Sequence, residues 1–303
     1  MADKELLQYS GIGQRLDAYL AYEFPEYSRE ILKGIIKEGR VLVNGQAAKP
    51  SLLLEEGDKV EVSWAAHKKE ASGLEKLVIF EDKSMLAINK PSGLLVHPLS
   101  PIWESNPRAV FEGENTLAAM ILAARPETEK QRLPRLGIVH RLDRETSGVM
   151  LLAKTLKAQE ELTRQFHDGE VSKTYVCIAV GEMKEEKGII EVPIGRLSGD
   201  KKIKASPIGR ISVTEYKVLK RLKGYTYVEL YPKTGRTNQL RVHMSWLGYP
   251  VMGDTLYGAK QEARLMLHSR MAVFKHPITR RKMAMEAPLP PDFKAILQKL
   301  GKK

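Results

Sequence analysis

The sequence predicts an α+β fold: a small N-terminal domain of helices and a hairpin, joined to a large domain with a mixed, mainly antiparallel sheet flanked by helices. In the second part of the chain, short strand-like runs recur at hairpin-like spacing, and helical patterns lie between only some of them. A regular alternation of strand and helix would instead indicate a doubly wound parallel sheet. A polar stretch of small residues separates this part from a shorter one. We expect a domain at 14–64, a linker at 65–75 and a second domain at 76–303.

The composition limits the class of protein. The 303 residues, of which 43% are apolar, are enough to form a large hydrophobic core. The single cysteine, Cys177, excludes a disulfide framework and any metal site built on several cysteines. The N-terminus shows no apolar signal segment, and no run of 18 apolar residues occurs. We expect a cytoplasmic protein without a membrane partner.

The charge is unevenly distributed along the chain. The net charge is +12, but residues 15–62 carry 7 Lys or Arg against 9 Asp or Glu. Residues 201–303 carry 22 against 6, a net charge of +16. Such a basic region favours a polyanionic partner, of which nucleic acid is the simplest. A basic surface without a binding function is the alternative.

The first domain is expected to contain two helices followed by a hairpin. The segment 14–24 is amphipathic, and Ser28 is placed to cap a second helix at 29–39. Asn44 and Gly45 predict a tight turn between short strands, and "EEGDKVEV" ends the domain as another turn and strand. Four basic residues at spacings of four, four and three line one face of the second helix: Arg29, Lys33, Lys37 and Arg40.

This first domain resembles the small RNA-binding domain named after ribosomal protein S-four. The resemblance covers the whole unit, including the basic helix, the "VLVNG" turn and the "GDKVEV" end. It implies that the basic helix face contacts the RNA backbone. A solvated helix face is the alternative interpretation, and the net negative charge of the domain is consistent with it.

The second domain is expected to alternate short strands with occasional helices. The run "LKAQEELTRQFHDG" at 156–169 predicts a helix. The expected strands are "LVIF" at 77–80, "MLAIN" at 85–89, "GLLV" at 93–96, "GVMLLA" at 148–153, "TYVCIAV" at 174–180 and "YTYVELY" at 225–231.

A polar loop, "HRLDRETSG" at 140–148, lies between two apolar runs, "LGIV" and "VMLLA", which we expect to be strands. A loop of this kind holds its side chains at the rigid edge of a sheet. Its carboxylates, Asp143 and Glu145, are the candidate chemical groups, and capping of nearby backbone N–H groups is the alternative role. The chain shows no helical zinc motif, no Gly-Lys-Ser phosphate loop and no nucleophile elbow.

Together with four other motifs, this loop resembles the Rlu-type pseudouridine synthases, which isomerise uridine in structured RNA. Five motifs in the same order make the resemblance specific, and they extend over nearly the whole second domain. The other four are "INKPSGLLVHP" at 88–98, "KTYVCIAVG" at 173–181, "LYPKTGRTNQLRVHMSWLGYPVMGDTLYG" at 230–258 and "RLMLHSRMAVFKHP" at 264–277.

The resemblance implies a role for several residues. Asp143 corresponds to the catalytic aspartate, Tyr175 to the tyrosine that packs on the target base, and Arg241 to the arginine that pairs with the aspartate. That arginine is expected to keep Asp143 ionised by lowering its pKa. Arg141 corresponds to an arginine that some members insert into the RNA to hold the target flipped out; a phosphate clamp is the alternative. Asn238 stands where the family usually has His.

The residues around Arg241 also predict a helix by themselves. Thr237 is the expected N-cap, and Gly248 ends the helix. Arg241 follows the core-facing Leu240 and lies about 100° around the helix axis, at the flank of the core face. Arg236 precedes the cap and is expected to bind phosphate near the helix N-terminus.

Two hypotheses about function follow. The first is an enzyme that isomerises specific uridines in ribosomal or transfer RNA, as a monomer and without a DNA partner. Because this isomerisation transfers no electrons and adds no group, we expect no cofactor and no metal. The second is a non-catalytic RNA-binding or ribosome-assembly factor that retains the fold. The presence of Asp143, Tyr175 and Arg241 together favours the enzyme.

Overall fold

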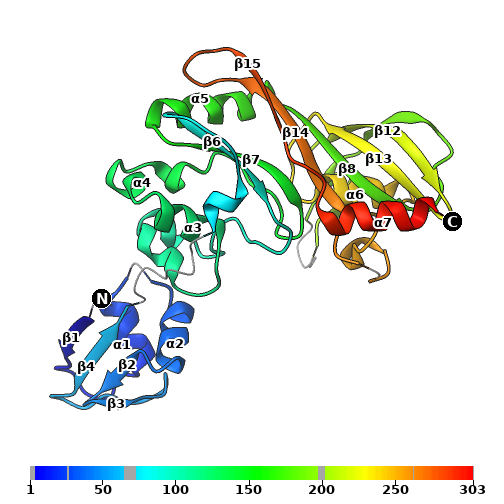
Figure 1. Ribbon diagram of the computed structural model, residues 1–303. Coiled ribbons are helices and arrows are strands. Elements are labelled where there is room, and N and C mark those ends of the chain that lie inside the picture. The colour runs from blue at the N-terminus through cyan, green and yellow to red at the C-terminus, as the bar shows by residue number, and fades with distance from the viewer. Residues whose placement is uncertain (1–3, 26, 65–72, 197–201, 262, 303) are drawn as a thin grey trace. The chain divides into compact units, whose positions relative to one another are not determined.

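A computed structural model describes residues 4–25, 27–64, 73–196, 202–261 and 263–302 (Figure 1). Its internal contacts divide the chain into two units, Met1–Lys76 with Leu95–Leu136, and Leu77–Leu94 with Gly137–Lys303. The segment 95–136, expected in the second domain, is thereby grouped with the first. Most of the predicted linker, 65–72, lies outside the described residues. Its last residues enter a 3₁₀ turn at Leu74–Leu77, in which Leu74 is buried. The boundaries 14–64 and 76–303 stay predictions.

The first unit contains a small antiparallel sheet and several helices. Its elements are β1 (Lys4–Gln8), α1 (Leu16–Glu23), α2 (Arg29–Lys37), β2 (Val41–Val43), β3 (Gln46–Ala47), β4 (Lys59–Ser63), α3 (Leu117–Ala124) and α4 (Glu127–Lys130), with the strands in the order β1-β4-β2-β3. The Ser28 hydroxyl accepts a hydrogen bond from the Ile31 N–H at 3.3 Å, which confirms the predicted cap of α2. The turn at Asn44 and Gly45 is also confirmed. Strand β1 was not predicted, because it is largely exposed and shows no period-two burial.

The second unit is built on a mixed sheet, as predicted. Its strands are β5 (Val78–Glu81), β6 (Met85–Lys90), β7 (Ser147–Ala153), β8 (Ser172–Val180), β9 (Lys187–Glu191), β12 (Val213–Leu222), β13 (Tyr225–Pro232), β14 (Leu267–Lys275) and β15 (Lys282–Glu286). They follow the order β5-β6-β7-β14-β8-β13-β12-β9, and β15 pairs with β14. The β7–β14 pair is parallel, and the other pairs are antiparallel. A separate hairpin is formed by β10 (Ile194–Gly195) and β11 (Lys204–Ala205).

Three helices cover this sheet: α5 (Leu156–His167), α6 (Gln239–Trp246) and α7 (Pro291–Gly301) (Figure 1). Helix α6 packs on a cluster that includes Cys177, whereas α7 packs on a cluster that includes Val176 and Ile178. Successive residues of a strand point to opposite faces, so α6 and α7 cover opposite faces of the sheet at β8. No helix among the described residues is long and apolar enough to cross a bilayer.

The parallel junction of β7 and β14 depends on a glycine of the polar loop. Gly148 has φ +117°, and a Cβ atom at this position would lie 2.1 Å from the carbonyl oxygen of Ser269 on β14. A side chain would therefore force the two strands apart. The conformation and the close approach explain why the loop "HRLDRETSG" ends in glycine.

Two of the predicted strands are absent. The run "GLLV" has irregular structure, because the carbonyls of Pro91 and Leu94 accept hydrogen bonds from the Lys90 ammonium instead of joining a strand ladder. The run "LGIV" makes only an isolated bridge, from Ile138 to Leu152. Both strand predictions were wrong because an apolar run does not show whether its backbone groups pair with another strand.

Candidate active site

A cleft of about 540 Å³ in the second unit collects most of the predicted site residues. Asp143 and Arg141 come from the polar loop, Tyr175 from β8, Arg241 from α6 and Arg236 from the loop before α6, and all five line the cleft. The order of the strands brings these segments together from positions about 100 residues apart in the chain. Three distant motifs therefore contribute to one site.

Two residues that the sequence reasoning did not single out hold the loop of Asp143 in place. The His140 ring stacks on Phe166 with 4.1 Å between centroids, and its Nε2 accepts a hydrogen bond from the Leu151 N–H at 2.9 Å. Burial lowers the pKa of His140 to about 3, so the ring is neutral at pH 7. The Lys90 ammonium is fully buried and donates to the carbonyls of Pro91, Leu94 and Arg144 at 2.8–2.9 Å. The sequence did contain a signal for Lys90, namely a lysine directly after the apolar run "MLAIN", which was expected to be a strand.

The environment of Asp143 raises its pKa above the ordinary value. Burial is the main cause. The nearby positive charges of Arg241, Arg141 and Lys90 lower the pKa, but by less than burial raises it. Arg241 lowers the pKa of Asp143, as expected, but burial outweighs this effect and the net shift is upward. Desolvation of a partly buried carboxylate outweighs the attraction of cations that do not hydrogen bond to it.

The hydrogen bonds of Arg241 go to a different carboxylate from the one expected. Its Nε and Nη2 each donate to the fully buried Asp254 at 2.7 Å. Its Nη1 donates to the Asn238 side-chain oxygen at 3.2 Å, and the guanidinium lies over the Tyr257 ring at 5.0 Å. Arg241 therefore acts on Asp143 through space rather than through a hydrogen-bonded pair.

Asn238 supports Arg241 and also replaces the predicted helix cap. Its φ of 56° lies in the left-handed region, which Asn tolerates better than most residues. Its side-chain nitrogen donates to the Tyr257 hydroxyl at 3.1 Å, while its oxygen accepts from Arg241. The structure places Asn238, not Thr237, at the N-cap of α6, and makes no side-chain cap there. The prediction of Thr237 as the cap was wrong, because the preceding turn is held by Gln239.

Tyr175 presents a neutral phenol to the cleft. Burial raises the pKa of Tyr175 to about 12, against a smaller lowering by the Ser269 side chain. The ring lies beside Asp143, whose negative charge also raises this pKa. At pH 7 the tyrosine can therefore stack on a base or donate a hydrogen bond, but it does not carry charge.

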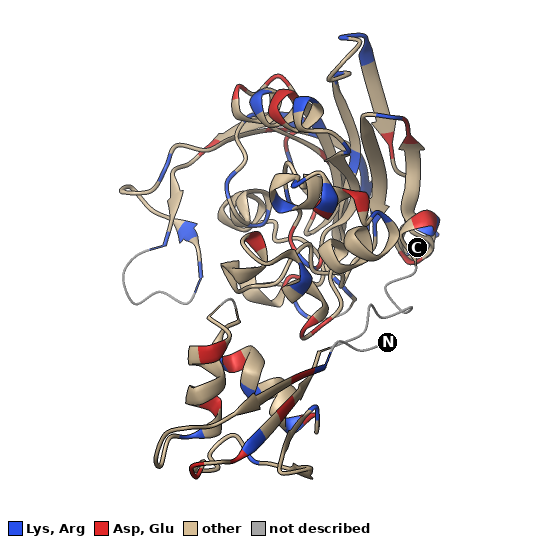
Figure 2. Cartoon of the chain, turned by 90° about the vertical axis from the view of Figure 1, so that its left-hand side faces the viewer, with Lys and Arg blue, Asp and Glu red and all other residues tan. Residues whose placement is uncertain are grey.

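The four basic residues predicted to line one face of α2, here called the basic stripe, are partly engaged in structural ion pairs. Arg29 donates to the fully buried Asp17 at 2.9 Å, and Arg40 forms an ion pair with the buried carboxylate of Glu112. Lys33 lies 3.3 Å from the exposed Glu30. Lys37 is exposed, on the last turn of α2. Figure 2 shows that acidic and basic positions are mixed along this unit. Because Arg29 and Arg40 are paired with buried carboxylates, the two lysines are better placed to meet a phosphate.

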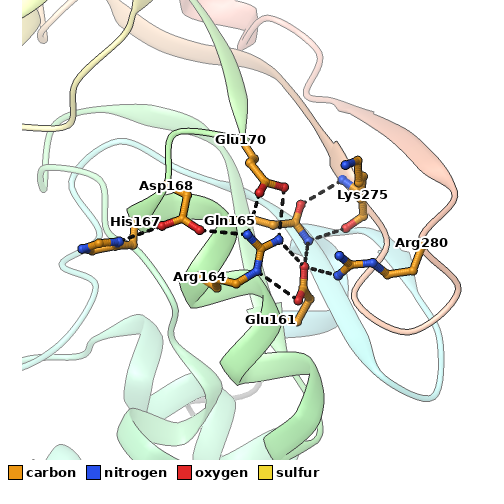
Figure 3. Close-up of polar contacts among 8 residues, drawn as sticks. All are labelled: Glu161, Arg164, Gln165, His167, Asp168, Glu170, Lys275 and Arg280. Atoms are coloured by element: carbon orange, nitrogen blue, oxygen red, sulfur yellow. Dashed lines mark hydrogen bonds and ion pairs between the residues drawn. The ribbon is translucent and has the colours of Figure 1, made fainter.

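A network of polar contacts fastens α5, which forms one wall of the cleft, to β14 and the turn after it (Figure 3). Arg164 donates to Glu161, Asp168 and Glu170. Glu161 also forms an ion pair with Arg280. The buried Gln165 side chain exchanges two hydrogen bonds with the backbone of Lys275, at 2.8 and 2.9 Å. This anchoring holds the end of α5, including His167 at the rim of the cleft.

Glu161→Gln is expected to lower the free energy of unfolding at pH 7, because Arg164 and Arg280 lose their charged partner. These hydrogen bonds, chiefly the one from Arg164, lower the pKa of Glu161 from 4.5 to about 2. A carboxylate with a depressed pKa contributes stability above its unfolded pKa, and this stability is lost as the pH falls through the folded pKa. Urea unfolding should therefore show a clear difference at pH 7 that shrinks between pH 4.5 and pH 2. The exposed neighbour Glu160→Gln is the control, and an equal loss at both ends of this range would contradict the prediction.

Comparisons with known proteins identify two family models and several relatives that match this chain. A family model described as RNA pseudouridylate synthase matches residues 84–246, and a model of the S4 domain matches residues 14–60. The chain is 36% identical to ribosomal large subunit pseudouridine synthase D of Pseudomonas aeruginosa, over 95% of this chain and 92% of the relative. It is 34% identical to the protein of the same name from Pasteurella multocida, over 97% and 93%.

A solved structure also shares the fold. Human RNA Pseudouridylate Synthase Domain Containing 4 superposes with a TM-score of 0.62 and 26% sequence identity. The match covers 77% of this chain and 96% of the human chain. The predicted fold class, with its small N-terminal domain and its mixed sheet, is confirmed.

Proposed function

Because the chain belongs to the RNA pseudouridylate synthase family and isomerises uridine to pseudouridine in RNA, we propose that it modifies large-subunit ribosomal RNA, with Asp143 as the catalytic carboxylate. The relatives named above are ribosomal large subunit enzymes, and the S4 domain supports an RNA substrate. A ribosomal RNA substrate would place the protein in the cytoplasm. The monomeric state and the absence of a DNA partner remain predictions.

The position of Asp143 supports its catalytic role. The reaction breaks the bond between C1′ of the ribose and N1 of uracil, and forms a bond from C1′ to C5 of the same base. A proton leaves C5 and another is gained at N1, so the product is an isomer of the substrate. One carboxylate can serve as nucleophile or base in this sequence. Across the described ranges no hydrogen bond is donated to the Asp143 carboxylate, which leaves its oxygens available to the substrate.

The target uridine must leave its helix before it can reach Asp143. C1′ and C5 are not accessible inside a stacked duplex, so the enzyme has to flip the nucleotide into the cleft. Tyr175 provides an aromatic face for the flipped base, and such stacking stabilises a bound base by about 1–3 kcal/mol. Arg141 and Arg236 are exposed at the cleft and supply positive charge for the RNA backbone.

The test of this function is a comparison of cells with and without the protein. Pseudouridine positions are mapped in total RNA from both, and the expected result is the loss of specific sites in large-subunit ribosomal RNA. The purified protein should restore the same sites on an unmodified transcript without added cofactor. Loss of sites only in transfer RNA, or no change in either RNA, would contradict the proposed substrate.

The double variant Lys33→Met/Lys37→Met is expected to weaken binding to a ribosomal RNA fragment that contains the mapped site. These two lysines are the stripe residues that are not paired with a buried carboxylate, so their removal should leave the fold intact. The slope of log affinity against log salt should fall by about 1 for each lysine that contacts a phosphate. Lys59→Met, on β4, is the control. An unchanged affinity and slope would make the stripe a solvated helix face.

A further inference from the structure

Two lysines line the cleft, and they differ in how their charges are compensated. Lys233 is exposed, and its ammonium lies 2.9 Å from the carboxylate of Glu215. Lys173 is partly buried on β8. In the part of the chain that the structure describes, Lys173 makes no hydrogen bond or ion pair through its ammonium. It is therefore a cation in a partly desolvated position without a counter-charge.

An uncompensated, partly buried ammonium is costly for a folded protein. Burial lowers the pKa of Lys173, and no carboxylate raises it. The positive charge of Lys173 also lowers the pKa of the neighbouring His140, so His140 supplies no counter-charge to Lys173. The cations that act on Asp143 include Arg241, Arg141 and Lys90, so Lys173 is not needed as the partner of the catalytic carboxylate.

The position of Lys173 connects it with the base-binding part of the cleft. It precedes Tyr175 by two residues on β8, so the two side chains leave the strand on the same face, about 7 Å apart along the strand. A Cβ atom added to Gly235 would lie 3.8 Å from the Lys173 ammonium, an ordinary van der Waals contact. The loop before α6 therefore lies close to the Lys173 ammonium at the cleft.

We propose that Lys173 forms a phosphate subsite that binds the backbone phosphodiester next to the flipped uridine while the uracil lies against Tyr175. The inference rests on the proposed function, since the ligand is the RNA backbone. Each nucleotide carries one anionic phosphodiester, which would supply the negative counter-charge that Lys173 lacks within the described protein. A hydrogen bond between ionised groups is stronger in a partly desolvated site than at an exposed one. The subsite would thus engage only when a nucleotide enters the cleft.

The stability of Lys173→Met separates this role from a structural one. Removal of an uncompensated charge strands no partner, so the melting temperature is expected to stay the same or to rise. RNA affinity or kcat/KM is expected to fall by about 10- to 100-fold, the range for a hydrogen bond to a charged group. Lys173→Arg keeps the charge and should recover part of this loss. Lys233→Met is the matched control, with an expected change of less than about 3-fold, because its charge is exposed and already paired.

The decisive experiment removes the charge from the RNA instead of the protein. The ribosomal RNA fragment with the mapped site is synthesised with single methylphosphonates at each phosphate within two nucleotides of the target. For wild type and Lys233→Met, one position next to the target should lower kcat/KM by about 10-fold or more. For Lys173→Met the same neutral phosphate should cause little further loss. Effects that add at every position, or a Lys173→Met enzyme as active as wild type, would overturn the proposal.

A binding measurement keeps the inference testable if the substrate proposal fails. A fluorescent pentauridylate is titrated with wild type, Lys173→Met and Lys233→Met at several salt concentrations, with no turnover required. Lys173→Met should bind about 10-fold more weakly, and its slope against log salt should be smaller by about 0.7. Equal affinity and slope for wild type and Lys173→Met would overturn the phosphate subsite. Inactivity of the wild type on ribosomal RNA, with this binding difference intact, would overturn only the proposed substrate.

Discussion

Asp143→Asn is expected to form no detectable pseudouridine while it binds RNA nearly as well as wild type. The substitution is almost isosteric, and no hydrogen bond to this carboxylate in the described structure would be lost. The amide, however, has neither the negative charge nor the nucleophilicity that the breaking and re-forming of the glycosidic bond requires. Single-turnover assays on the mapped ribosomal RNA fragment, together with filter binding, measure the two properties separately.

The other carboxylate of the same loop provides the matched control. Glu145 is exposed and lies within hydrogen-bonding distance of the Ser92 hydroxyl rather than in the cleft. Glu145→Gln removes the same charge two residues away and should retain most of the activity. Activity near wild type in purified Asp143→Asn, or an equal loss in both variants, would remove Asp143 from the catalytic role.

Arg241→Met is expected to lose both activity and stability. The fully buried Asp254 loses its two-pronged partner, and a stranded buried charge typically costs about 3–5 kcal/mol. Arg241 also lowers the pKa of Asp143, which burial already raises. Without the arginine this pKa rises further, so the ionised fraction of Asp143 at neutral pH falls. Activity that depends on the ionised form is lost as the pH falls through that pKa, and a higher pH should restore part of it.

A double variant separates the two effects of Arg241. Arg241→Met/Asp254→Asn removes the stranded charge and should regain much of the stability in urea unfolding, but not the single-turnover rate at pH 7. Arg241→Lys should be more active than Arg241→Met and less active than wild type, because lysine cannot make the two-pronged contact with Asp254. If the double variant recovers stability and full activity together, Arg241 serves the fold alone.

The sequence determined the elements whose signals are local. The cap at Ser28, the turn at Asn44 and Gly45 and the helix α5 each depend on a few consecutive residues, and all three are confirmed. The order of the motifs also identified Asp143, Tyr175 and Arg241, which the structure places in one cleft. Local propensity and the motifs could do this because they need no knowledge of distant neighbours.

The tertiary structure decided what each of these side chains contacts and how it ionises. No spacing in the sequence showed that Asp254 is the partner of Arg241. The place of Lys90 after an apolar strand was visible, but not that its ammonium holds three backbone carbonyls. The upward shift in the pKa of Asp143 and the uncompensated charge of Lys173 were equally hidden. Hydrogen-bond partners and desolvation depend on groups that the fold brings together from distant positions in the chain. A sequence pattern can therefore name candidate reacting groups, whereas their electrostatic environment exists only in the folded protein.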